Sequence, residues 1–394
     1  KSPVRASALV AIGGGQTLEE PLVVRPTSET IIGHMYSKWI KSYRDLPVLI
    51  NQWANVVRWE LRTRLFLRTL EFYWQEGHTA HATAEEAQEE TIRMLNTYAD
   101  FAVNEAAIPV ISGRKSAAEK FAGAVMSYTI EAMMGDTRAL QSGTSHNLGQ
   151  NFAKAFDIQY LDKVNNLQYC WTTSWGLSTR FIGAIIMTHG DDQGLILPPR
   201  LAPIQVVIIP IYHNDEEKSK VMAFVDQVNA SLEGLRTKVD DRSELTPGFK
   251  FNDWEMRGVP VRIEVGPKDV INNSVMIVRR DLTGQEAKSA HSLAGLGEKV
   301  RFELDAIHNN LLEKARKFRD EHIYDPKNYT ELQQVLENGW AYSYWCGDAK
   351  CELKVKEDTK ATTRCIPLDQ NCAPGKCIVC GKPANEKVYF ARAY

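Results

Sequence analysis

Cysteine spacing near the C-terminal end of the chain is typical of a metal site. Two cysteines with four residues between them are followed, after 25 residues, by two more with two residues between them. Zinc in structural sites is bound by four soft ligands in a tetrahedron, and four protein ligands leave no open position for catalysis. We therefore expect a structural zinc ion, although Cys365 and Cys372 lie between the pairs and could compete as ligands. The expected ligands are Cys346, Cys351, Cys377 and Cys380.

A second pattern could bind a nucleotide. Arg58 and Glu60 are followed by Arg68 and Phe72 in a region that we expect to form strands. An arginine can hold a phosphate or a carboxylate through two parallel hydrogen bonds, and a phenylalanine can stack on a purine. An Arg–Glu pair on adjacent strands is usually a salt bridge, so this pattern is weak evidence when taken alone.

A third pattern lies in residues 176–180, where a glycine and Arg180 flank an expected junction between a strand and a helix. The first turn of a helix offers free N–H groups and the positive end of its dipole to an anion. Arg180 would add charge at that point. The alternative is a solvated arginine with no ligand.

Length and composition limit the classes of protein to which these patterns can belong. The chain has 394 residues, 44% hydrophobic and 24% charged, with a formal net charge of −2. This length exceeds the roughly 250–300 residues of a single core, so we expect more than one domain. No apolar run approaches the roughly 18 residues of a membrane span. Seven cysteines at this length do not indicate a disulfide scaffold, and we expect a reducing, cytoplasmic location.

Helices and clustered strands alternate irregularly in the first half of the chain. This arrangement favours an antiparallel sheet flanked by helices, an α+β fold, over residues 1–200. We expect helices at 26–45, 84–107 and 178–189, and strands at 46–52, 55–60, 66–77 and 168–175.

Regular alternation of strand and helix follows residue 200 and predicts a small α/β domain over 201–310. The remaining segment, 311–394, would form a zinc-binding unit whose residues 346–381 are expected to be loop. In the α/β domain we expect a helix at 215–235 that begins at Asp215, a helix at 298–319, and strands at 205–211, 259–265 and 275–280.

Considered together, the motifs resemble a known family. The pattern of Arg58, Glu60, Arg68 and Phe72 resembles motif 2 of class II aminoacyl-tRNA synthetases, and residues 176–180 resemble motif 3. Four further stretches look like prolyl-tRNA synthetases, most closely those of the eukaryotic and archaeal type. They are residues 25–29 (RPTSE), 74–78 (WQEGH), 120–123 (KFAG) and 143–149 (GTSHNLG).

The resemblance implies a ligase that joins L-proline to ATP as prolyl-adenylate and then transfers the prolyl group to the 3′ end of tRNA(Pro). ATP, Mg²⁺ and the structural zinc ion would be its cofactors. Arg58 and Arg180 would be catalytic, with Arg58 bridging the proline carboxylate and the α-phosphate. The implied ATP-binding residues are Arg58, Glu60, Arg68, Thr69, Phe72, Gln141, Thr144 and Arg180, with Phe72 and Arg180 on either side of adenine. The implied proline-binding residues are Thr27, Glu29, Arg58, Trp74, Glu76, His78, Phe121, His146 and Ser174.

The resemblance assigns the α/β domain to anticodon binding, yet this domain has 14 cationic and 17 anionic side chains. Recognition must therefore depend on a few residues. The proline anticodon has two adjacent guanines, whose N–H donors suit a carboxylate and whose O6 and N7 suit Arg or Lys. The candidates are Glu264, Lys268, Asp269 and Arg279, also Arg280, with Phe251 or Trp254 to stack a base.

Motif 1 of the class II family, a dimerisation segment, is not recognisable in the chain. The resemblance implies a homodimer formed through such a segment upstream. The span between motifs 2 and 3 is too short for a large editing insertion. The alternative function is a synthetase-like module that has lost catalysis and only binds tRNA, against which the retained Arg58, Arg68 and Arg180 argue.

Overall fold

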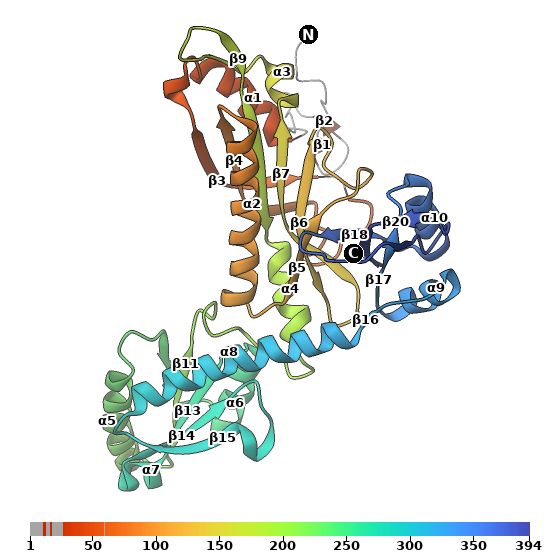
Figure 1. Ribbon diagram of the computed structural model, residues 1–394. Coiled ribbons are helices and arrows are strands. Elements are labelled where there is room, and N and C mark those ends of the chain that lie inside the picture. The colour runs from red at the N-terminus through yellow and green to blue at the C-terminus, as the bar shows by residue number, and fades with distance from the viewer. Residues whose placement is uncertain (1–10, 13–15, 18–26, 59) are drawn as a thin grey trace.

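A computed structural model describes residues 11–12, 16–17, 27–58 and 60–394. Its largest element is a ten-stranded sheet in the order β16-β17-β21-β18-β5-β6-β7-β10-β4-β3 (Figure 1). All neighbours in this sheet are antiparallel except β16 and β17. The bounds are β3 Val48–Val57, β4 Glu71–His81, β5 Val110–Arg114, β6 Met126–Met133, β7 Ala139–Gly149, β10 Trp171–Ser178, β16 Ile323–Tyr324, β17 Trp340–Trp345, β18 Thr362–Pro367 and β21 Glu386–Ala391.

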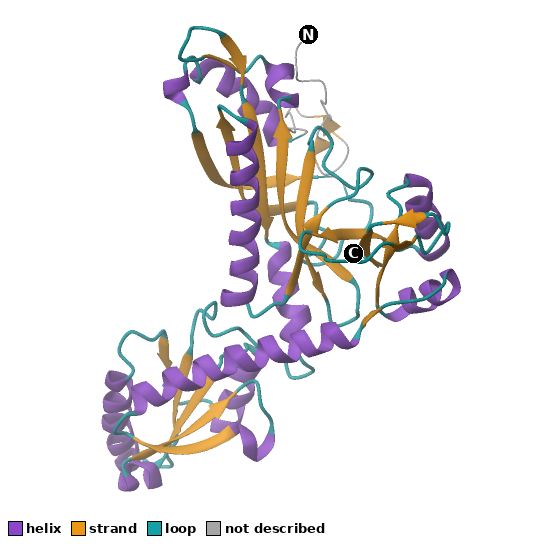
Figure 2. Ribbon diagram, in the orientation of Figure 1, coloured by secondary structure: helices purple, strands orange, loops and turns teal. Residues whose placement is uncertain are grey.

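Helix α2 (Ala84–Asp100) covers one face of this sheet, as Figure 2 also shows. Its start is fixed by a capping box in which Thr83 and Glu86 satisfy each other's backbone N–H groups. Its buried residues include Leu95 and Tyr98, which share a core with Ile130 of β6. The other helices of this part are α1 (Ser28–Trp39), α3 (Asn151–Phe156) and α4 (Arg180–His189), with a 3₁₀ turn at Tyr43–Asp45 and a π-helical turn at Phe101–Glu105.

A five-stranded sheet in the order β12-β11-β13-β14-β15 forms a separate layer, in which β11 is parallel to β12 and β13. Helices α5 and α8 pack on one face of it around an aliphatic core. The strands are β11 Val206–Pro210, β12 Thr237–Val239, β13 Val261–Val265, β14 Ser274–Arg279 and β15 Lys288–Ser292. The helices are α5 Asp215–Ser231, α6 Pro247–Met256, α7 Pro267–Asn272 and α8 Leu296–Glu321, with a 3₁₀ turn at Gly284–Ala287.

The C-terminal segment extends the large sheet. Figure 1 shows α8 running from the five-stranded sheet to β16, after which the chain adds β17, β18 and β21 to the strands of the N-terminal part. Strand β18 pairs with β5 through Ile366 and Pro367. Gly113 permits this approach, since a Cβ there would lie 2.6 Å from the Ile366 carbonyl oxygen. The remaining elements are α9 (Tyr329–Asn338), α10 (Ala349–Thr359) and three two-stranded pairs, β1–β2 (Ala11–Ile12, Gln16–Thr17), β8–β9 (Gln159–Leu161, Leu167–Tyr169) and β19–β20 (Gly375–Lys376, Pro383–Ala384).

The expected fold class, an antiparallel catalytic sheet followed by an α/β domain and a small C-terminal unit, is confirmed. Several details were wrong. Residues 346–381 are not all loop, since they contain α10 and β18. The two strands expected at 46–52 and 55–60 are the single strand β3, and Asn214 rather than Asp215 caps α5.

None of the helices in the described ranges is both long and apolar enough to cross a membrane.

Candidate active site and metal centre

A cavity of about 250 Å³ opens on the ten-stranded sheet, between β4, β7 and β10. Most of the residues expected to bind ATP or proline line it, although they come from segments far apart in the sequence. These are Thr27, Glu29, Arg58, Phe72, Trp74, Glu76, Phe121, Gln141, Thr144, His146, Ser174 and Arg180.

Strand register explains why these side chains meet. Glu76 of β4 is paired with Gly176 of β10, which is paired with Thr144 of β7. One row further along, Ser174 is paired with His146. Residues that are directly opposite each other across neighbouring strands point to the same face of a sheet, so both rows line the same cavity.

Glu76 supplies a buried anion at one end of the cavity. It accepts hydrogen bonds from Ser28 Oγ at 2.7 Å and Gln52 Nε2 at 2.5 Å, and its second oxygen lies 3.2 Å from His78 Nε2. Burial alone would raise the pKa of Glu76, but the bonds from His78, Ser28 and Gln52 outweigh it and the net pKa is lowered. A carboxylate that remains ionised here can pair with an ammonium group.

Buried polar atoms in the cavity are left free for a ligand. Among the described residues, Ser174 Oγ and Trp74 Nε1 have no hydrogen-bond partner. Ser174 is only 2% exposed, and a buried polar group without a partner is costly.

Trp175 forms part of the wall by lying across Gly77, where a Cβ would be 2.0 Å from the indole ring. The glycine of the WQEGH stretch is therefore required by packing.

Two arginines, Arg58 and Arg180, line the cavity, and Arg68 lies in a hollow that adjoins it. The guanidinium of Arg58 lies 5.4 Å from the ring centre of Phe72, and Arg180 Nε donates to the Leu67 carbonyl at 3.0 Å. Burial, followed by the positive charges of Arg68 and Arg58, lowers the pKa of Arg180. Cations that repel one another in this way favour a bound anion.

A smaller hollow adjoins the arginines and shares Arg58, Phe72 and Arg180 with the cavity. It also holds the expected Glu60, Arg68 and Thr69, and Arg68 lies 3.6 Å from the Glu60 carboxylate. Arg68 Nη2 also donates to the Tyr394 carbonyl oxygen at 2.8 Å. Phe72 and Arg180, which were expected on either side of adenine, thus line both the cavity and the hollow. Arg58 covers one face of the Phe72 ring.

His78 and His146 differ from each other in position. His78 was expected in the wall, but it does not line the cavity: it lies behind Glu76 and is 3% exposed. His146 does line it, with its ring 4.9 Å from that of Phe121 and its Nδ1 2.8 Å from Ser127 Oγ. Burial lowers the pKa of His146 to about 4, so this imidazole is neutral near pH 7.

Several lining residues were not anticipated. Trp175 adjoins the 176–180 motif and Ser178 lies within it, and both could have been found from strand alternation. Lys115 and Ser127 belong to segments with no recognisable pattern of their own. The additional residues are Lys115, Glu119, Ser127, Ser142, Gly143, Trp175, Gly176 and Ser178.

The four cysteines expected to bind zinc are brought together by the C-terminal unit. Their Sγ atoms all lie within 4.8 Å of one another, and Cys346 Sγ is 3.7 Å from the Sγ atoms of both Cys351 and Cys380. Zn–S bonds of about 2.3 Å in a tetrahedron place the sulfurs about 3.8 Å apart. The donor set therefore fits a structural zinc ion. Cys365 and Cys372 lie outside this group.

Comparison with known proteins agrees with this geometry. Family models match residues 13–189 (tRNA synthetase class II core domain of the G, H, P, S and T enzymes), 205–303 (anticodon binding domain) and 329–394 (prolyl-tRNA synthetase, C-terminal). The proline–tRNA ligase of Chloroflexus aurantiacus is 59% identical over 389 residues, which are 98% of this chain and 81% of that protein. The chain belongs to the prolyl-tRNA synthetase family.

Relatives in this family span bacteria and eukaryotes. The chloroplastic/mitochondrial proline–tRNA ligase of Arabidopsis thaliana is 55% identical, with 98% of this chain and 72% of that protein covered. The crystal structure of the Cryptosporidium parvum prolyl-tRNA synthetase complexed with L-proline and AMP is 42% identical, covers 98% of this chain and 83% of that chain, and gives a TM-score of 0.91. The same enzyme complexed with halofuginone and AMPPNP gives a TM-score of 0.93, with 98% and 80% covered.

The residues expected to recognise the anticodon are not all on one surface. Glu264 and Arg262 form an ion pair of 3.0 Å on one face of the five-stranded sheet. Lys268 and Asp269 follow in α7, where Asp269 accepts from the Gly266 N–H at 2.8 Å. Arg279 points to the opposite face.

Three of the anticodon candidates, Arg279, Trp254 and Arg280, already form ion pairs or hydrogen bonds within the protein. On the α8 face, Arg279 is paired with Asp281 and Glu303 at 2.7 and 3.0 Å. Trp254 is buried and donates to Asp240 at 2.7 Å, so it does not offer a stacking face, whereas Phe251 is partly exposed. Arg280, 7% exposed, is paired with Asp191. These contacts between side chains could not be anticipated from residue type.

Zinc binding can be tested through the melting temperature. Cys346→Ser should lower it by several degrees in zinc-loaded protein, because ligand loss removes metal-linked folding energy. Cys372→Ser is the matched control, since Cys372 lies outside the cysteine group and its sulfur is within hydrogen-bonding distance of Tyr342 and Gln370. Cys365 is less suitable, because it is fully buried and a serine there would bury a hydroxyl. Metal analysis that finds no zinc in protein purified without chelator would contradict the assignment.

Proposed function

We propose that the chain activates L-proline with ATP and transfers the prolyl group to the 3′ end of tRNA(Pro). One observation carries this proposal: a single cavity is lined by an ionised carboxylate, Glu76, and by the guanidinium groups of Arg58 and Arg180, and the hollow that adjoins it adds Arg68. The carboxylate suits the charged ring nitrogen of proline, and the arginines suit phosphates.

Activation brings two anions together, since the proline carboxylate attacks the α-phosphate of ATP. It requires charge neutralisation and alignment rather than a nucleophile from the protein. Arg58 lines both the cavity and the hollow beside it, which is the position of a bridge between the two anions. Arg68 and Arg180 would hold the other phosphates, with Mg²⁺ bound to the nucleotide and Glu60 as a candidate ligand.

The proline pocket would be formed by the remaining lining residues. Glu76, Thr27 and Glu29 supply acceptors for the ring nitrogen, and Trp74 and Phe121 supply apolar walls. Neutral His146 and the free Ser174 hydroxyl would complete the site, while Gln141 and Thr144 would contact ATP. In this arrangement His78 acts on proline only through its contact with Glu76.

An inactive module that only binds tRNA is less well supported. Such a module would have no need to maintain three converging arginines or a buried hydroxyl without a partner.

The proposed division is a catalytic domain at 1–200, an anticodon-binding domain at 201–310 and a zinc-binding domain at 311–394. The C-terminal cysteine group and the short span between motifs support the eukaryotic/archaeal type, and seven free cysteines support a cytoplasmic location.

We also propose a homodimer. Strand β3 is an edge strand of the large sheet. Leu49, Trp53 and Val57 lie on the same face of this strand, and all three are exposed. Trp53 is 85% exposed. An exposed apolar edge of this kind favours pairing with another chain. The mass of the particle in solution, by light scattering, tests this: a single-chain mass at micromolar concentration would contradict it.

Arg58→Ala should lower proline activation on the order of 10²–10³-fold in kcat, because the lost charge acts on the transition state. The measurement is proline-dependent exchange of pyrophosphate into ATP. Arg44→Ala is the control, since Arg44 is exposed, lies in a 3₁₀ turn and stacks on the partly buried Tyr43 outside the cavity. A variant with near wild-type kcat would exclude the proposed role of Arg58.

Glu264→Ala should weaken aminoacylation of tRNA(Pro) while leaving pyrophosphate exchange intact, because the five-stranded sheet lies apart from strands β4, β7 and β10 (Figure 1), whose residues line the cavity. Losing contacts to one guanine should cost about tenfold or more. Glu286→Ala, an exposed glutamate of the same domain, is the control. Equal loss of both activities would show that Glu264 is structural.

A further inference from the structure

One wall of the cavity is a loop that the C-terminal unit holds. Residues 115–124, here called the pocket loop, connect β5 to β6 and carry Lys115, Glu119 and Phe121, all of which line the cavity. Within the described residues of this loop the structure shows no regular helix or strand. Turn hydrogen bonds, such as that from the Lys120 N–H to the Ser116 carbonyl at 3.0 Å, hold it locally, and side-chain contacts fix it to the rest of the protein.

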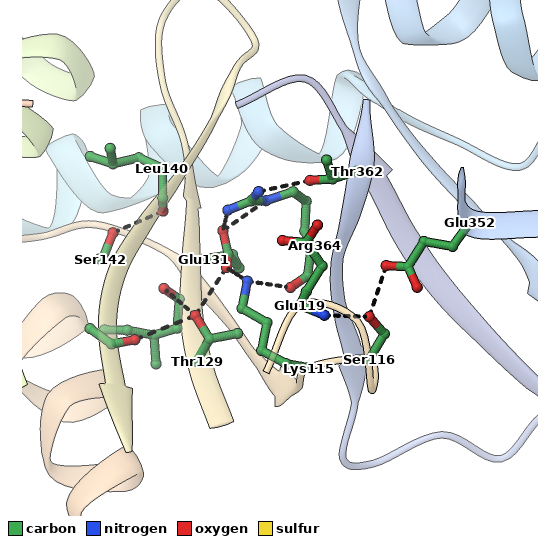
Figure 3. A network of polar contacts seen from close by, with 12 residues as sticks. Lys115, Ser116, Glu119, Thr129, Glu131, Leu140, Ser142, Glu352, Thr362 and Arg364 are labelled. Carbon is green, nitrogen blue, oxygen red and sulfur yellow. Dashed lines mark hydrogen bonds and ion pairs between the residues drawn. The ribbon is translucent and has the colours of Figure 1, made fainter. Parts of the chain in front are cut away.

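The first anchor is a buried ion cluster (Figure 3). Lys115 Nζ donates to the Glu131 carboxylate at 2.8 Å and to the Arg364 carbonyl at 2.9 Å, and Arg364 Nη2 donates to the other Glu131 oxygen at 2.8 Å. Glu131 is fully buried. Burial alone would raise its pKa, but the charges of Arg364 and Lys115 outweigh it and keep the pKa low. Arg364 belongs to β18, so the C-terminal unit completes this cluster.

The second anchor is a hydrogen bond to helix α10. Ser116 Oγ donates to Glu352 at 2.8 Å and accepts from the Glu119 N–H at 3.2 Å, as Figure 3 shows. Ser116 and Glu352 are 2% and 5% exposed. Glu352 is next to Cys351, which belongs to the cysteine group, so the candidate metal centre and the loop anchor share the first turn of α10.

The far end of the loop joins the pocket wall. The Phe121 N–H donates to Ser127 Oγ at 3.0 Å, and Ser127 Oγ also lies 2.8 Å from His146 Nδ1. The ring of Phe121 packs on that of His146. A continuous series of contacts thus leads from α10 through the loop to the aromatic wall.

We infer that Glu352 and Arg364 of the C-terminal unit are positioning residues that fix the pocket loop and so set the affinity for proline. This inference rests on the proposed function. Neither residue lines the cavity, so each acts through the loop. Without the Glu352 anchor, the binding-competent position of Phe121 would be populated less, and apparent affinity falls with that population.

Pyrophosphate exchange at varied proline and ATP concentrations tests this in the full chain. Glu352→Ala should raise the KM for proline about tenfold, with kcat and the KM for ATP changed less than about twofold. Glu352→Gln should stay close to wild type, because the amide oxygen still accepts from Ser116. Glu357→Ala is the control, an exposed glutamate on the same helix.

Limited trypsin digestion adds a measurement that does not depend on proline. Lys120 lies in the pocket loop, and Glu352→Ala should speed cleavage after it several-fold, whereas Glu352→Gln and Glu357→Ala should not. If wild type shows no proline-dependent exchange, the proposed function fails, and faster cleavage would still support the anchor. The inference would be overturned if Glu352→Ala left either the cleavage rate or the KM for proline unchanged. It would also be overturned if Glu352→Ala raised the KM values for proline and ATP equally and lowered the melting temperature.

Discussion

Opposite charges must be kept ionised and apart within one small cavity, and much of the structure follows from this constraint. Glu76 stays anionic because Ser28, Gln52 and His78 surround it with hydrogen bonds. Arg58 and Arg68 lie near Arg180, and burial, followed by their positive charges, lowers the pKa of Arg180.

A sheet is suited to this task because register fixes every lining residue relative to its neighbours. The pairing of Glu76 with Gly176 and of Ser174 with His146 sets both rows of the cavity, and a slip of one residue would turn them to the other face. The C-terminal unit extends the same sheet through β18, and its Arg364 completes the charge balance around Glu131. The C-terminal unit therefore contributes contacts to the N-terminal part of the sheet as well as to its own fold.

How far the sequence predicts this arrangement depends on how local each feature is. The cysteine pairs and the motif arginines were found because their residue types and spacing are informative in themselves. The central strands β5, β6 and β7 were missed, since β5 and β7 contain glycine and several polar residues and show no clear alternation of apolar side chains. Pairings such as Arg279 with Glu303, and the anchoring of the pocket loop by Glu352, join residues distant in the chain, so no local pattern reveals them.

The central claim is that Glu76 binds the proline ammonium as an ionised carboxylate. Calorimetric titration with L-proline, comparing wild type with Glu76→Gln, tests it most directly, because the amide has nearly the same shape but no charge. The account predicts that Glu76→Gln weakens proline binding by about tenfold or more while ATP binding is unchanged. Equal proline affinity in the two proteins would contradict it.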